Sequence, residues 1–187
     1  MASIPDLEQR FYDFLEMLDR REGCVRGHSL AVSELAVKIG RALGLSEQEL
    51  VHVAAGALMH DVGKVFIDSR VLAKPGALSP PEWKTIRLHP ILGEALLTSS
   101  TFEQAVLGIV RWHHERWDGA GYPDGLDGRA IPLGARIVAA ADAFSAMCES
   151  RPYRSALSAS DAAKELEESS WAQFDGRCVR ALVESLN

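Results

Sequence analysis

The segment from Val51 to Gly63 constrains the fold more than any other part of the chain. It reads VHVAAGALMHDVG and is apolar nearly all round, which is typical of a helix buried among other elements. Ser46 followed three residues later by Glu49 is a capping-box pattern and predicts where this helix begins. The rest of the chain is therefore expected to surround it.

The remaining segments show the apolar spacing of helices, and none alternates as a strand does. Further helices are predicted at about 6–21, 28–43, 80–88, 90–98, 102–116, 133–149, 159–169 and 177–186. Two ordered loops are expected, at 63–79 and 118–132. A chain of 187 residues, 47% of them hydrophobic, is predicted to form one all-α domain with a proper core.

Charge and cysteine content narrow the class of protein. The formal net charge of -6 argues against binding of a nucleic-acid polymer, which requires a basic surface. No apolar run approaches the roughly 18 residues of a membrane span, and the N-terminus lacks the features of a signal peptide. The three cysteines are widely spaced and form no CxxC, which suits a reducing cytoplasm. We therefore expect a cytoplasmic protein that does not associate with membranes.

Several charged groups occur where burial would be costly without a partner. His60 and Asp61 end the apolar helix, and Asp142 lies in the small-residue segment ARIVAAADAFSAM. A divalent metal ion would compensate these groups. For Asp142 the alternatives are a helix cap or an ion pair, for which Arg136 is available.

The histidines and carboxylates are stronger evidence for a metal site as a set than singly, because they come from five separate segments. The candidate metal ligands are His28, His60, Asp61, His89, His113, His114 and Asp142. They exceed the needs of one ion and suit two ions that share a carboxylate. Asp61 is the natural bridge because it adjoins His60. His52 has no acidic or glycine-rich neighbour and is assigned a structural role.

Residues 111–123, RWHHERWDGAGYP, combine two kinds of site in one short stretch. The predicted helix end carries two histidines, and the following loop surrounds a single tyrosine with glycines that allow close backbone approach to a ligand. The alternative is an ordinary helix end and turn, with both histidines facing water.

These features together resemble the HD-GYP family, the HD-superfamily metal phosphohydrolases that act on bacterial cyclic di-GMP. The order H…HD…H…HH…GYP…D is similar from His28 to about Leu157. The matching segments are HDVGK (60–64), KPGALSPPEW (74–83), HPILGEALL (89–97), HHERWDGAGYPDGLDGRAIP (113–132), ARIVAAADAFSAM (135–147) and RPYRSALS (151–158). The long block around GYP makes the resemblance specific.

The resemblance implies a compact all-α HD-domain bundle at 24–187, with a metal site in its core. The loop at 118–132 that contains Gly121, Tyr122 and Pro123, called the GYP loop below, would lie beside that site. It implies a phosphodiesterase that hydrolyses cyclic di-GMP to pGpG, GMP or both, using a hydroxide that bridges two divalent iron or manganese ions. The seven candidate ligands above would hold these ions. Members with three ions resemble one another in a Glu four residues before the first His. Here Cys24 occupies that position, which favours two ions.

The resemblance also implies roles in catalysis and substrate binding. Asp61 and Lys64 are the implied catalytic residues, and Lys64 would contact the scissile phosphate. The implied substrate-binding residues are Lys64, Gly121, Tyr122, Pro123, Arg151 and Arg154. For the two arginines the alternative is simple surface solvation. The chain departs from the family pattern at Asp68-Ser69 and at Ser150, all outside the ligand set.

Two other functions compete with this one. The chain could be an HD phosphohydrolase for another nucleotide, although the intact GYP loop argues against that. It could instead be a module that binds cyclic di-GMP or docks to a diguanylate cyclase without turnover, but no ligand is lost. Family domains usually follow a receiver or sensor domain, so residues 1–23 are interpreted as an N-terminal helix that serves as a linker or as a homodimerisation segment.

Overall fold

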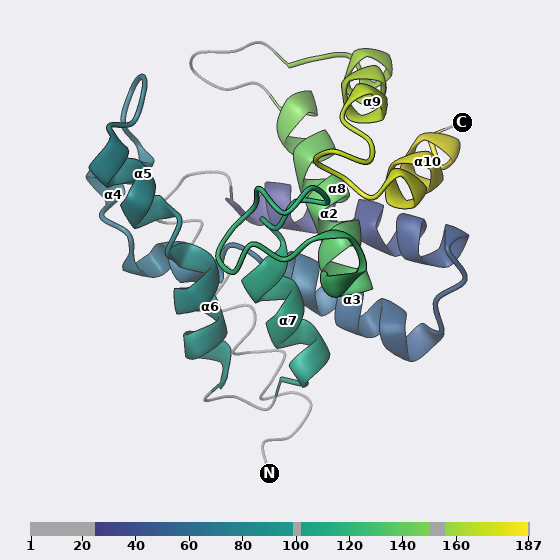
Figure 1. Cartoon of the computed structure of the whole chain (residues 1–187), viewed down its shortest axis with the longest axis horizontal. Coiled ribbons are helices and arrows are strands. Elements are labelled where there is room, and N and C mark those ends of the chain that lie inside the picture. The colour runs from purple at the N-terminus through teal and green to yellow at the C-terminus, as the bar shows by residue number, and fades with distance from the viewer. Residues whose placement is uncertain (1–24, 99–101, 150–155, 187) are drawn as a thin grey trace.

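The computed structural model describes residues 25–98, 102–149 and 156–186 (Figure 1). Within these ranges there is no strand, which confirms the all-α prediction. The elements are α2 Val25–Ala42, α3 Glu47–Met59, η1 Val62–Phe66, α4 Ser69–Leu72, α5 Pro80–Ile86, α6 His89–Thr98, α7 Gln104–Trp112, η2 Gly128–Ala130, α8 Leu133–Cys148, α9 Ala159–Glu168 and α10 Gly176–Glu184. No helix among the described residues is both long enough and apolar enough to cross a bilayer. The predicted helix 6–21, Cys24, Arg151 and Arg154 lie outside the described residues.

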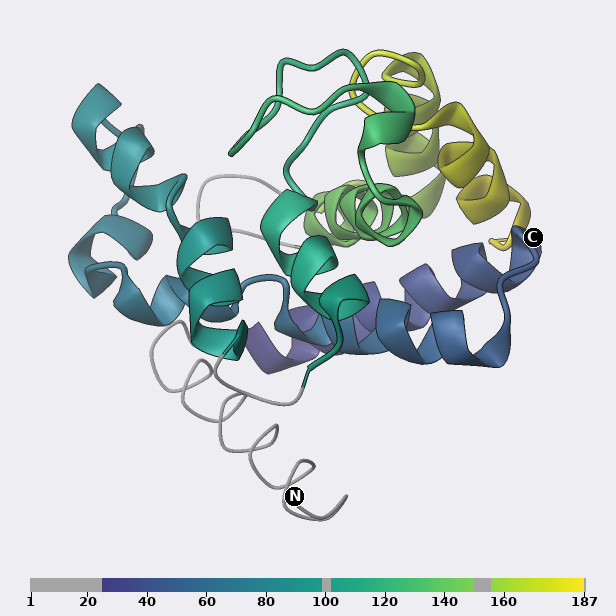
Figure 2. The same ribbon diagram turned by 60° about the horizontal axis from the view of Figure 1, so that its bottom comes forward.

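The predicted central helix is confirmed as α3. Its start carries the predicted capping box, in which the Ser46 backbone N–H donates to Glu49 Oε2 at 2.8 Å. Helices α2, α7 and α8 all pack against it, and Figure 2 shows α7 and α8 lying across the α2–α3 pair. A Cβ at Gly56 would lie 2.6 Å from Ile109 Cγ2, so a glycine is needed where α3 meets α7.

The buried apolar residues form two clusters, and the predicted ligands adjoin both. The larger cluster includes Ala140 and Ala141, which directly precede Asp142 in α8. The smaller cluster includes Met59 and Val62, which flank the His60–Asp61 pair. Buried apolar residues of both clusters therefore flank the candidate ligands in the sequence.

The prediction of a loop throughout 63–79 is wrong in part, because η1 and α4 occupy much of it. The first turn of η1 can form against α6 only because Gly63 has no side chain: a Cβ there would lie 2.6 Å from Gly93 N. Asp68 caps α4 by accepting from the Arg70 backbone N–H at 2.9 Å. Short elements such as these depend on single glycines and caps rather than on apolar spacing.

The helix predicted at 102–116 ends earlier, at Trp112. The Glu115 backbone N–H donates to Trp112 O at 3.0 Å and closes a turn there. His113 and His114 consequently lie just beyond the helix rather than within it. The predicted loop at 118–132 is present, with η2 as its one regular turn.

Candidate metal centre

The ends of helices place most of the predicted ligands. His28 lies in the first turn of α2, His60 and Asp61 follow α3, His89 opens α6, and His113 and His114 follow α7. Asp142 is the exception, because it projects from the middle of α8. All seven predicted ligands are thereby brought together in the interior.

The seven residues fall into two groups whose donor atoms lie within 4.8 Å of one another. One group contains Asp61, His89, His113 and His114, and the other contains His28, His60 and Asp142. Asp61 faces both groups: its Oδ1 is 3.3 Å from His89 Nε2, and its Oδ2 is 3.3 Å from His60 Nε2. One oxygen of the Asp61 carboxylate is therefore directed toward each group.

The backbone fixes the orientation of three of the imidazoles. In each of them Nδ1 donates to the carbonyl three residues earlier, at 2.6 Å for His60 and 2.8 Å for both His89 and His113. These carbonyls lie in the last turns of α3, α5 and α7, where the helix itself leaves them without a partner. With Nδ1 occupied in this way, the Nε2 atom of each ring points into the centre and offers a lone pair when the ring is neutral.

The donor atoms fit divalent ions. His60 Nε2 is buried and makes no hydrogen bond. His89 Nε2 and His113 Nε2 are 3.3 Å apart, yet both rings already use Nδ1 as the donor, so two lone pairs face each other. A cation between them would remove that repulsion, and imidazole with carboxylate is a set that first-row metals accept.

The ionisation of the first group suits metal binding. Burial lowers the pKa of His89 to about 4 and that of His114 to about 3, and burial together with the neighbouring imidazoles holds the pKa of His113 well below its usual range. Burial alone would raise the pKa of Asp61, but the Lys64 ammonium and His60 outweigh it and hold this pKa well below its usual range. The group therefore offers neutral rings and an anionic carboxylate.

His60 differs from these rings. Burial would lower its pKa, but the carboxylates of Asp61 and Asp142 outweigh burial and raise the pKa to about 9. A divalent ion that binds His60 Nε2 must therefore displace a proton from it.

Asp142 does not pair with Arg136, which was the alternative partner. Arg136 Nη1 donates instead to Asp175 Oδ2 at 2.6 Å. Asp142 Oδ1 lies 3.0 Å from His28 Nε2 and 3.9 Å from His60 Nε2. The Asp142 carboxylate therefore lies against His28 and His60 and not against Arg136.

His52 lies apart from both groups of ligands. Its Nε2 is 3.1 Å from Glu103 Oε2, and neither group includes it.

Of the predicted substrate-binding residues, Lys64 and Tyr122 contact members of the first group. Lys64 Nζ donates to Asp61 Oδ2 at 2.7 Å. The Tyr122 ring stacks on His114 with centroids 4.8 Å apart. Arg87, which the sequence interpretation missed, places its guanidinium carbon 5.1 Å from the centroid of the Tyr122 ring. A signal for Arg87 was available, because it is a cation two residues before the candidate ligand His89.

The GYP loop is fixed to the end of α7 by a network of hydrogen bonds. Glu115 is buried, and its Oε1 accepts from the backbone N–H groups of Asp124 at 2.7 Å and Gly125 at 3.0 Å. Asp124 in turn accepts from Arg111 Nε and Trp112 Nε1, both at 2.7 Å. The loop is therefore held rigidly beside the ligand groups.

Two residues of GYP itself have backbone roles. A Cβ at Gly121 would lie 2.5 Å from the Glu115 Cα, so the glycine permits the loop to pass directly over the chain at 115–116. Pro123 follows Tyr122 through a cis peptide bond.

Comparison with known proteins identifies the family of this chain. A family model described as HD domain matches residues 14–178. The chain is 41% identical to the cyclic di-GMP phosphodiesterase response regulator RpfG of Xanthomonas campestris, covering 98% of this chain and 50% of that protein. It is 33% identical to the 3'3'-cGAMP-specific phosphodiesterase 3 of Vibrio cholerae, covering 93% and 38%. The chain thus spans half or less of the length of these relatives.

A solved structure shows the same fold. The HDG"Y"P protein Bd1817 from Bdellovibrio bacteriovorus superimposes with a TM-score of 0.71 at 24% identity, covering 87% of this chain and 52% of that one. The family match extends over most of the chain. The chain therefore belongs to the HD domain family and, with Gly-Tyr-Pro at 121–123, to its HD-GYP members.

Proposed function

We propose that this chain is a phosphodiesterase that hydrolyses cyclic di-GMP to linear pGpG, GMP or both in bacterial second-messenger signalling. The observation that carries the proposal is the pair of ligand groups joined by the two oxygens of Asp61. Relatives that are 41% and 35% identical bear the name cyclic di-GMP phosphodiesterase, which supports the choice of substrate.

Two divalent ions, iron or manganese, are the proposed cofactors. Asp61, His89, His113 and His114 would hold one ion, while His28, His60 and Asp142 would hold the other, with Asp61 shared. When bound, such a pair polarises a phosphoryl group and lowers the pKa of water.

The chain's own residues bind and orient the dinucleotide in this proposal. The Lys64 ammonium, which lies 2.7 Å from Asp61, is placed to neutralise charge that grows on the non-bridging phosphate oxygens. Tyr122, flanked by Gly121 and Pro123, presents an aromatic ring beside the ligands for contact with a nucleotide. Arg87, exposed above that ring, adds a cation for a phosphate group.

The remaining partners are also proposals. Arg151 and Arg154 would reach the phosphates from a segment outside the described residues. The relative RpfG is named a response regulator, and the chain covers half of it, so we propose a receiver or sensor domain, or a diguanylate cyclase, as the regulatory partner. We propose that the protein acts in the cytoplasm, which suits the free thiols of Cys148 and Cys178. We also propose that residues 1–23 link the chain to a further domain or form a homodimer.

The decisive test is anaerobic incubation with cyclic di-GMP and either Fe²⁺ or Mn²⁺, followed by chromatography of the products. Wild type should release pGpG or GMP, and Asp61→Ala should release neither because it removes the shared ligand. Glu168→Ala, at the exposed end of α9, is the matched control and should behave as wild type. Binding of cyclic di-GMP without turnover by metal-loaded wild type would show a receptor and overturn the proposal.

The preferred substrate is tested in the same assay. Three relatives are named 3'3'-cGAMP-specific phosphodiesterases, so 3'3'-cGAMP should be compared with cyclic di-GMP at equal concentration. Faster turnover of 3'3'-cGAMP would move the assignment to that substrate and keep the reaction class.

A further inference from the structure

His28 is held differently from the other oriented ligand rings. His60 and His113 directly follow α3 and α7, and His89 opens α6 three residues after the last residue of α5. In each case a carbonyl in the last turn of the preceding helix accepts Nδ1–H. His28 lies instead in the first turn of α2, where the nearby carbonyl groups serve the helix's own hydrogen bonds. This ring therefore needs a side chain to fix its orientation.

Glu149 provides that side chain. Its Oε1 lies 2.8 Å from His28 Nδ1, and the hydroxyl of the buried Ser145 donates to the same oxygen at 3.1 Å. Ser145 Oγ is itself 3.2 Å from His28 Nδ1. The His28 ring is thus held at Nδ1 by a carboxylate and a hydroxyl, both of which come from the end of α8.

The positions of these residues along the chain explain how both nitrogens of the His28 ring are contacted from α8 and its end. Asp142 and Ser145 are three residues apart and share one face of α8, Glu149 directly follows the last residue of that helix, and α8 packs against α2. Asp142 Oδ1 approaches His28 Nε2 at 3.0 Å, while Glu149 approaches Nδ1 at 2.8 Å. The candidate ligand Asp142 and the residues that support His28 are therefore placed by α8 and the residue that follows it.

We propose that Glu149 is a positioning residue of the metal centre, which holds His28 with the proton on Nδ1 and presents Nε2 to the ion bound by His28, His60 and Asp142. Carboxylates that hold a ligand histidine in this way affect both ring orientation and metal affinity. The inference rests on the proposed binuclear site. It concerns metal binding, however, and can be tested without turnover.

The test is titration of the metal-free chain with Mn²⁺, following stoichiometry by elemental analysis and spin coupling by electron paramagnetic resonance. Wild type should bind two ions as a coupled pair. Glu149→Ala should weaken one of them by about 10- to 100-fold and show the signal of an isolated Mn²⁺ at intermediate concentrations. Glu149→Gln keeps an oxygen that can accept the Nδ1–H, so its affinity should lie closer to wild type.

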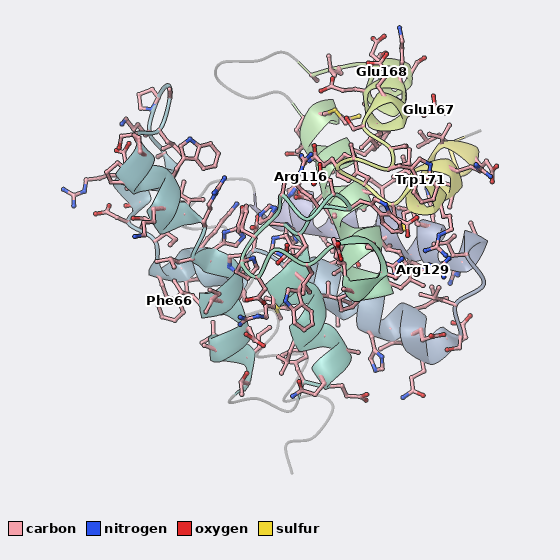
Figure 3. The ribbon with its side chains drawn as sticks, in the orientation of Figure 1. Phe66, Arg116, Arg129, Glu167, Glu168 and Trp171 are labelled. Atoms are coloured by element: carbon pink, nitrogen blue, oxygen red, sulfur yellow. The ribbon has the colours of Figure 1, made fainter. Side chains whose placement is uncertain are left out.

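The control is Glu168→Ala, because Glu168 also ends a helix and, as Figure 3 shows, lies on α9 at the periphery. It should bind both ions as wild type does. Unchanged affinity for both ions in Glu149→Ala would overturn the assignment, and so would equal weakening of both ions with a lower melting temperature of the metal-free chain. A wild type that binds two ions but leaves cyclic di-GMP intact would overturn only the proposed activity.

Discussion

Among single residues, substitution of Lys64 should impair catalysis without weakening metal binding. Its ammonium lies 2.7 Å from Asp61 Oδ2, close to where phosphate charge would develop. Lys64→Ala should lower kcat by about 100- to 1000-fold, the usual effect of removing one such donor. Its affinity for Mn²⁺ should not fall, because the substitution removes a cation that competes for Asp61. Steady-state kinetics and metal titration of the same preparation measure both quantities.

Lys84→Ala is the matched control for this prediction, because Lys84 is exposed on α5. A kcat for Lys64→Ala close to that of Lys84→Ala would show that Lys64 has no role in the reaction.

Arg87 should affect substrate binding rather than catalysis. It is exposed, its guanidinium contacts Tyr122, and among the described residues it forms no ion pair, so it can turn toward a phosphate. Arg87→Ala should raise KM for cyclic di-GMP about 10-fold, equivalent to about 1.4 kcal/mol, and leave kcat and metal content unchanged. Arg87→Lys should lie between the two. Arg180→Ala, exposed on α10, is the control, and an equal KM in both alanine variants would contradict the role.

Sequence was sufficient to predict which histidines and carboxylates come together, but not everything that holds them. Asp61 and Asp142 could be found because a carboxylate in an apolar helix requires a partner. The carbonyls that hold His60 and His113 are three residues away along the chain. Glu149 lies 121 residues from His28, and such a contact depends on the packing of α2 against α8.

At the scale of elements, the GYP loop should tolerate no side chain at Gly121. A Cβ there would meet the Glu115 Cα at 2.5 Å, which is backbone that cannot rotate away. Gly121→Ala should therefore destabilise the fold by about 1–3 kcal/mol, as overpacking does, and reduce activity by displacing Tyr122 from His114. Thermal unfolding and turnover assays measure these two effects.

Gly27→Ala is the control for stability, because a Cβ at Gly27 would meet nothing within 4 Å. In the helix α2 it should stabilise by about 0.5–1 kcal/mol. Equal stability of the Gly121 and Gly27 variants would show that the loop can move away from residues 115–116.

The element boundaries show where sequence patterns stop being informative. The start of α3 was predictable, since the Ser46–Glu49 capping box is local. The end of α7 was not, because Glu115 turns its carboxylate toward the backbone of Asp124 and Gly125 instead of continuing the helix. Apolar spacing at 102–116 carries no sign of that tertiary contact.

For the whole molecule, metal binding should contribute strongly to stability. The ligands join α2, α3, α6, α7 and α8 at one point. Without ions this point holds His60 Nε2, which is buried beside Asp61 without a hydrogen bond, and the opposed Nε2 atoms of His89 and His113. The folded state alone presents the complete set of donors, so ions that bind it shift the unfolding equilibrium toward the native chain.

Mn²⁺ at about 100 times its dissociation constant should therefore stabilise the chain by about 2.7 kcal/mol, or about 5–10 °C in Tm for a domain of this size. A chelator should reverse the shift. Asp61→Ala should show a much smaller rise, because both ions lose the carboxylate that they share. A Tm that does not respond to Mn²⁺ in wild type, or that rises equally in Asp61→Ala, would mean that these buried histidines stabilise the helices without an ion, and the binuclear site would be wrong.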